Sequence, residues 1–214
     1  MAESGKVLVG FVASAAFAGV LVKTITSFRR HFPNVEFEVR EMEVRRQFQW
    51  LVNGDLDISI FRAPMEPPVG ISAVVVMREP LIAVFREGHP LSLRRSVSVA
   101  EVAQEPILTI RQPSDVAFHN VAVTACNEAG VNATIIPVGA DFAELGSLVG
   151  IGKGACLLAK SFEKMQMPGV CFVPVVDCET TSDVSIAFRT NDPSPAVANF
   201  VGHCKSMALS VDNI

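Results

Sequence analysis

Two strand–turn–helix units in succession fill the first 62 residues, and they restrict the fold more than any other feature. Residues 6–12 (KVLVGFV) form a short apolar run, as expected of a strand buried on both faces. From Phe17 to Phe32 apolar residues recur at steps of three or four, the period of a helix with one buried stripe. Residues 35–40 and 57–61 are the next strands. The sequence therefore predicts parallel strands with helical crossovers, which bind ligands at the carboxyl ends of the strands.

The rest of the chain continues the alternation. A short helical stripe containing Val44 and Phe48 ends at Asn53-Gly54. A further helix is predicted at 116–128, and further strands are predicted at 74–77, 81–85, 107–110, 133–138 and 184–188. Ser194 and Pro195 then signal the start of the last helix. We predict an α/β protein with two Rossmann-like lobes joined by two crossovers. Residues 1–76 plus 177–214 form lobe I and residues 77–176 form lobe II, a hinged pair that encloses a cleft.

The first turn, around Ser14, is the best indication of function. Ser14 stands just before the predicted helix, where its hydroxyl can accept a bond from a backbone N–H and the helix dipole favours a carboxylate. A plain helix cap is the alternative interpretation. Arg62 is predicted at the same sheet edge, either as an anion clamp or in a salt bridge between lobes.

The N-terminal stretch also imitates a secretory signal with an A-x-A cleavage site. Glu3 offsets Lys6, however, and Gly10 interrupts the apolar run, so the match is poor. Removing this stretch would also take away the first strand. No stretch reaches the ~18 to 20 apolar residues of a membrane span, and we expect a soluble, cytoplasmic protein.

Composition narrows the function further. The net charge of −4 disfavours binding of nucleic acid by this chain alone. The five cysteines include no C-x-x-C pair, which favours a reducing compartment, and the scattered histidines give no metal-ligand spacing. We expect no cofactor. No nucleophile–base pair or G-x-S-x-G elbow indicates an enzyme. The glycines at 150, 152 and 154 lack the order of a phosphate loop and are interpreted as caps where a helix turns into a strand.

Several segments together resemble the effector-binding domain of LysR-type transcriptional regulators, above all those that sense benzoate or muconate. The resemblance rests on Val9-Gly10-Phe11-Val12, the turn at residues 32–35, residues 51–58 (LVNGDLDI), residues 79–84 with His89-Pro90-Leu91, and residues 145–159 (LGSLVGIGKGACLLA). It covers nearly the whole chain in order and spacing. It implies a fold like the type 2 periplasmic binding proteins, with a small effector held between the lobes.

The resemblance also implies a set of effector-binding residues. The first-turn serine and its neighbour match Ser14 and Ala15, and an arginine after the third strand matches Arg62. Val44 stands where those sensors have a threonine; it cannot donate a hydrogen bond, which favours a small, partly apolar acid over a muconate-like one. In the second lobe the matching residues are Val116, Ala117 and Phe118. A dicarboxylate held at both places would bridge the lobes.

The expected function is the effector-sensing and oligomerisation part of a LysR-type regulator of aromatic catabolism. Its effector would be a small aromatic or dicarboxylic acid, the protein would be a homo-oligomer, either dimer or tetramer, and DNA would be bound only through a helix-turn-helix domain that precedes this chain. A secreted solute-binding protein of similar fold is the alternative, and a two-lobed enzyme is a third class for which the sequence offers no catalytic group.

Overall fold

The computed structural model describes residues 4–111, 117–207 and 209–210. The chain divides into two compact units: Met1–Arg78 with Asp183–Ile214 form unit 1, and Glu79–Ser182 form unit 2. The sequence placed the two divisions after residues 76 and 176. Residues 177–182 stay with unit 2 because Thr181 pairs with Pro80 and the Ser182 N–H donates to the Glu79 carbonyl at 2.9 Å.

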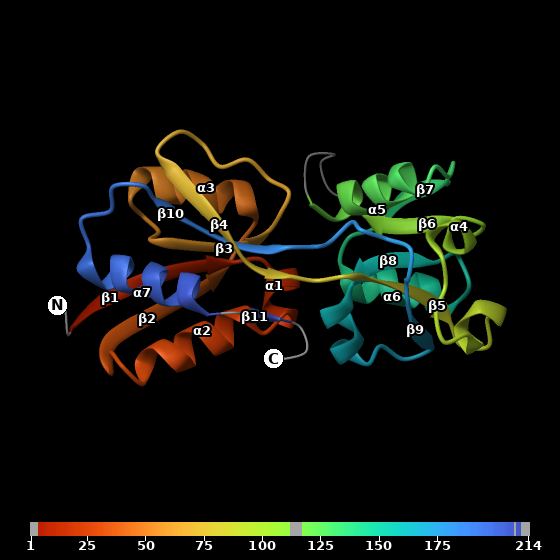
Figure 1. The fold of residues 1–214 in the computed structure, drawn as a ribbon, viewed down its shortest axis with the longest axis horizontal. Coiled ribbons are helices and arrows are strands. Elements are labelled where there is room, and N and C mark those ends of the chain that lie inside the picture. The colour runs from red at the N-terminus through yellow and green to blue at the C-terminus, as the bar shows by residue number, and fades with distance from the viewer. Residues whose placement is uncertain (1–3, 112–116, 208, 211–214) are drawn as a thin grey trace. The chain divides into compact units, whose positions relative to one another are not determined.

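Unit 1 is built on a mixed sheet (Figure 1). Its strands are β1 (Ser4–Phe11), β2 (Asn34–Glu41), β3 (Ile58–Arg62), β4 (Ile71–Arg78), β10 (Val184–Arg189) and β11 (Leu209–Ser210), in the spatial order β11-β4-β10-β3-β1-β2. β1 runs parallel to β2 and β3, as predicted. β10 is antiparallel to both β3 and β4, so the sheet is not purely parallel.

The helices of unit 1 are α1 (Ala13–Phe17), α2 (Val20–Arg29), α3 (Val44–Asn53) and α7 (Pro195–Ser206). The prediction of one continuous first helix is wrong, because Gly19 adopts a left-handed conformation with φ of 73° and separates α1 from α2. The predicted C-terminus of α3 and the predicted N-terminus of α7 are confirmed. Gly54 follows α3 in the left-handed conformation, and the Ser194 hydroxyl caps α7, which has Pro195 in its first turn.

Two apolar clusters bury the faces of this sheet. On one face α2 and α7 pack around Phe28, which is fully buried and lies edge-on to Phe37 and Phe200. On the other face α3 contributes Val44, Phe48 and Leu51. The sheet is thus covered on both sides, which explains why residues 58–62 are all buried.

Unit 2 combines a parallel pair of strands with an antiparallel three-stranded sheet. β6 (Ile107–Ile110) runs parallel to β7 (Ile135–Gly139), while β8 (Cys156–Ala159), β5 (Leu81–Arg86) and β9 (Val170–Pro174) form the order β8-β5-β9. Its helical segments are α4 (Val99–Val102), α5 (Ala117–Glu128), α6 (Phe142–Gly150) and the 3₁₀ turns η1 (Pro90–Leu93) and η2 (Lys160–Met165).

The three glycines after residue 149 make the turn between α6 and β8, as the sequence predicted. Gly150 is the last residue of α6, and Gly152 has a φ of 78°. Gly154, with a φ of 158°, lies against β6: a Cβ there would be 2.2 Å from the carbonyl oxygen of Pro106. This backbone contact, rather than a phosphate, explains the glycine.

The described residues show neither a metal site nor a membrane span. Within them, no group of three or more histidine, cysteine or acidic side chains is placed to hold a metal ion. No helix in the same part of the chain is long and apolar enough to cross a bilayer.

Candidate functional site

The carboxyl ends of β1, β2 and β3 meet at one edge of unit 1. The Met42 N–H donates to the Phe11 carbonyl at 3.0 Å, and the Val12 N–H donates to the Ile60 carbonyl at 3.1 Å. The chain leaves these three strands toward Ser14, Val44 and the loop after Arg62. The predicted site residues of unit 1 therefore follow three neighbouring strands.

Ser14 and Arg62 are in direct contact at this edge. The Arg62 guanidinium donates to the Ser14 carbonyl from Nε at 3.2 Å and from Nη2 at 2.9 Å. Arg62 is only 3% exposed and Ser14 only 6%. Among the described residues, the Ser14 hydroxyl has no hydrogen-bond partner. A buried cation thus contacts the turn that carries the Ser14 hydroxyl.

The local structure around Ser14 differs from the prediction in one respect. Ser14 does not precede the helix: α1 begins at Ala13, and its N-cap is Val12, which has no capping side chain. Because α1 has only five residues, its dipole is a weak source of positive charge. Arg62 supplies that charge instead. Ala15 follows inside α1 and is fully buried.

Val44 is the first residue of α3, and its side chain belongs to the apolar cluster of that helix. The residue before it is a carboxylate that the sequence analysis did not single out. Glu43 accepts the N–H groups of Arg45 at 3.0 Å and Arg46 at 3.2 Å through Oε2. The first turn of α3 is therefore already capped by an anion from within the chain.

The predicted residues of unit 2 are only partly described. Val116 lies outside the described residues. Ala117 and Phe118 open α5, where the backbone is described but the side chains are not. The assignment of this half of the site stays a prediction.

The sequence analysis missed a buried polar contact of Gln47, on α3, with Met42 and Ser59. Gln47 is fully buried; its Nε2 donates to the Met42 carbonyl at 2.8 Å, and its Oε1 accepts the Ser59 hydroxyl at 2.7 Å. Gly10 lies against the same side chain: a Cβ there would be 3.0 Å from Gln47 Oε1. The available signal was the position of Gln47 on the apolar stripe of α3, one turn after Val44.

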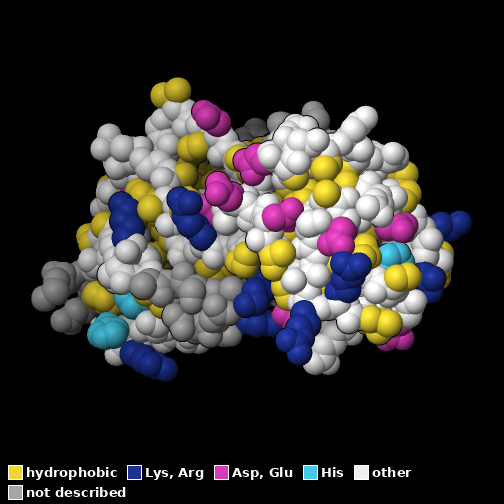
Figure 2. All heavy atoms as spheres, turned by 45° about the vertical axis from the view of Figure 1, so that its right-hand side comes forward, with side chains coloured by type: hydrophobic (Ala, Val, Ile, Leu, Met, Phe, Trp, Pro, Cys, Tyr) yellow, Lys and Arg dark blue, Asp and Glu magenta, His cyan; other side chains and the backbone are white. Residues whose placement is uncertain are grey.

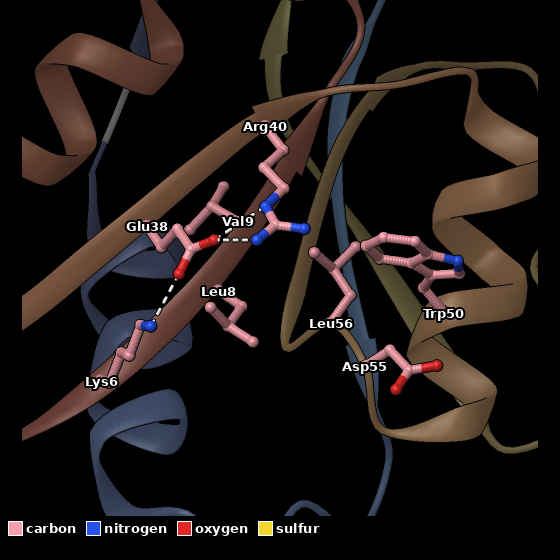
Figure 3. Close-up of a pocket in the computed structure, with 8 residues that line it drawn as sticks. All are labelled: Lys6, Leu8, Val9, Glu38, Arg40, Trp50, Asp55 and Leu56. Carbon is pink, nitrogen blue, oxygen red and sulfur yellow. Dashed lines mark hydrogen bonds and ion pairs between the residues drawn. The ribbon is translucent and has the colours of Figure 1, made fainter.

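A separate pocket of about 280 Å³ opens between β1, β2 and α3 (Figure 3). Leu8, Leu56 and Trp50 contribute apolar side chains to its lining. On the rim Glu38 pairs with Lys6 at 2.6 Å and with Arg40. These two cations hold the pKa of Glu38 below its usual value. Because Glu38 already pairs with both cations and Asp55 adds a second carboxylate to the lining, this pocket is less suited to an acid than the Ser14–Arg62 contact.

Figure 2 displays one face of the surface. There, acidic and basic side chains of the described residues are interspersed with apolar ones. This distribution agrees with the net charge of −4.

Comparison with known proteins identifies the class of this fold. Residues 2–208 match the family model described as the LysR substrate binding domain. The uncharacterized HTH-type transcriptional regulator YnfL of Escherichia coli K12 is 28% identical over 94% of this chain and 68% of its own length. YnfL and the relatives AlsR and BudR are described as HTH-type transcriptional regulators, not as enzymes. This chain spans 65 to 68% of the length of these three proteins.

Similarity to solved structures confirms the predicted two-lobed fold. The effector-binding domain of BenM with its effector benzoate has a TM-score of 0.81 and 25% identity over 94% of this chain and 90% of that one. BenM comes from Acinetobacter baylyi. The LysR-family regulator CbnR has a TM-score of 0.84 at 18% identity, covering 94% of this chain and 69% of that one. The chain belongs to the substrate-binding domains of the LysR family of transcriptional regulators.

Proposed function

We propose that this effector-binding domain binds a small carboxylic acid, aromatic or dicarboxylic, at the contact between Ser14 and Arg62. One observation carries the proposal: a guanidinium that is only 3% exposed donates two hydrogen bonds to the carbonyl of Ser14, whose own hydroxyl has no hydrogen-bond partner among the described residues. The printed title of the BenM structure, which names benzoate as effector, supports the choice of an acid.

The chemistry of this contact suits a carboxylate. A buried guanidinium favours a nearby anion, and a hydrogen bond to a charged group is worth about 1.5 to 3 kcal/mol. The Ser14 carbonyl orients the guanidinium through two of its nitrogens, so little side-chain entropy is lost when an acid binds. Val44 is apolar and Glu43 is negative on the neighbouring turn. Both favour an acid whose body is partly apolar over one that needs further donors there.

For the whole protein we propose the usual consequence of effector binding in a sensor: the acid favours one state of a pre-existing equilibrium. The domain would act in the cytoplasm within a homo-oligomer, dimer or tetramer. DNA contact would come from a helix-turn-helix domain preceding it. The family match favours this assignment over a secreted solute-binding protein.

Calorimetry with benzoate, muconate and succinate tests the proposal, with benzyl alcohol as the uncharged comparison. We expect at least one acid to bind and the alcohol not to bind. Ser14→Ala should weaken binding about tenfold, since one bond to a charged group is lost. Ser92→Ala is the matched control, because that hydroxyl bonds only locally to the His89 carbonyl in unit 2. Binding that is unchanged in Ser14→Ala, or absent for every acid, contradicts the proposal.

Arg62 and Phe118 are tested separately. Arg62→Lys keeps the charge but loses the two-nitrogen contact, and we expect weaker binding when the affinity is measured well below the melting temperature of the variant. Phe118→Ala tests the predicted half of the site in unit 2. If only Phe118→Ala leaves the affinity unchanged, that half is wrong while the Ser14–Arg62 assignment stands.

A further inference from the structure

Gln47 lies where three elements of unit 1 meet. Its side chain touches Gly10 of β1, accepts a hydrogen bond from Ser59 of β3 and donates one to the carbonyl of Met42, the residue that follows β2. Gln47 and Ser59 are both fully buried. In an apolar surrounding, buried polar groups of this kind are costly unless every bond is made.

This contact joins the three chain segments that lead to the proposed acid site. Gly10 is four residues before Ser14, Gln47 is three residues after Val44, and Ser59 is three residues before Arg62. A displacement of the Gln47 amide therefore acts on each segment within four residues of a proposed site residue.

We propose that Gln47 is a positioning residue for effector binding, an inference that rests on the proposed function. Its amide fixes the turn at Met42 relative to β3, and so fixes the start of α3 relative to Arg62. A Cβ at Gly10 would lie 2.9 Å from a methyl group of Leu56 and 3.0 Å from Gln47 Oε1, so a larger residue there would displace these two side chains. The amide is uncharged, so it holds the turn without competing with the acid for Arg62.

A purely structural role would give a different result from a positioning role. If the role is purely structural, loss of the contact lowers the melting temperature, while the folded protein binds every acid with its original affinity. A positioning role changes the affinity of the folded protein. It also changes the ratio of affinities between acids of different shape, because small displacements at a binding site affect shapes unequally.

The experiment measures benzoate and muconate affinity by calorimetry, well below the melting temperature, for Gln47→Met, Ser59→Ala and the double variant. We expect Ser59→Ala, which removes one buried hydrogen bond, to weaken binding about tenfold, and Gln47→Met, which removes two, to weaken it at least as much. The double variant should lose much less than the product of the two, because both changes break the same contact. The matched control is Gln49→Met, an exposed glutamine of the same helix, which should bind as the wild type does.

The outcomes separate this inference from the proposed function. If the wild type binds no acid, both fail. If it binds and Gln47→Met and Ser59→Ala bind equally well, only the positioning role is overturned. Full multiplication of the two effects in the double variant also overturns it, because the residues would then act independently. Should Gln47→Met not fold, Ser59→Ala alone decides, since it removes only the hydroxyl.

Discussion

The environment of His203 leads to a prediction on pH. Its Nε2 lies 3.0 Å from the Ser27 hydroxyl, linking α7 to α2, and its ring lies 6.1 Å from that of His31. Burial, and then the proximity of His31, lower the pKa of His203 from its ordinary value of 6.5. The unfolded chain therefore binds this proton more readily than the folded one, so acid favours unfolding. We expect the free energy of unfolding to fall as the pH drops below 6.5.

Urea titrations between pH 5 and pH 8 check this expectation. His203→Gln, which retains a partner for Ser27, should flatten the pH dependence in the acid range. His31→Gln should flatten it only in part, because burial is the larger cause of the shift. A wild-type acid slope that His203→Gln leaves intact would show that other groups produce it.

Single side chains inside unit 1 differ in how well the sequence predicts their roles. Arg62 was predicted because it follows a predicted strand at the carboxyl edge of the sheet. Gln47 was not, since a glutamine on a helix ordinarily faces solvent, and its partners lie 12 and 5 residues away along the chain. Glu43 was missed because whether a carboxylate caps a helix depends on where the helix begins.

At the scale of elements, short strands were predicted well and one break within a helical stretch was missed. The strand predicted at 107–110 agrees with β6 residue for residue, the prediction for β10 lacks one residue at its end, and the prediction for β3 is shifted by one residue. Their apolar runs are short and bounded by turn residues. The α1–α2 break was missed because the apolar period runs through Gly19 without interruption, and only the backbone conformation of that glycine reveals the break. The four-residue α4 is too short to show a period.

The turn between α6 and β8 allows a matched pair of substitutions. Gly154→Ala would place a methyl group 2.2 Å from the Pro106 carbonyl oxygen, a backbone atom that cannot move without displacing β6. We expect it to destabilise the protein by about 1 to 3 kcal/mol. For Gly150→Ala the nearest atoms would be 3.6 Å away, and we expect a change within about 1 kcal/mol. Thermal denaturation compares the two variants. Equal melting temperatures would mean that position 154 tolerates a side chain.

At the scale of the whole chain, the two units differ in how their sequences are arranged. Unit 2 is one continuous segment, Glu79–Ser182, whereas unit 1 needs Met1–Arg78 and Asp183–Ile214 together. The reason is β10, which pairs with β3 on one side and β4 on the other. Without β10 the sheet of unit 1 loses its central link, and without α7 the cluster around Phe28 loses Phe200.

This arrangement predicts the behaviour of fragments. Residues 79–182 expressed alone should show a cooperative thermal transition by circular dichroism, because their core is complete. Residues 1–78 alone should not, and adding residues 183–214 as a separate chain should restore a transition. A cooperative transition in residues 1–78 by themselves would contradict the central role of β10.

The position of β10 also has a consequence for synthesis in the cell. A ribosome releases the whole of unit 2 before it releases the strand that completes unit 1. Residues 1–78 must therefore wait, with the edges of β3 and β4 unpaired, while about a hundred further residues are translated, roughly 5 to 20 s at ordinary rates of elongation. In that interval the exposed strand edges are open to pairing with other chains. Overexpressed protein should therefore aggregate chiefly through unit 1.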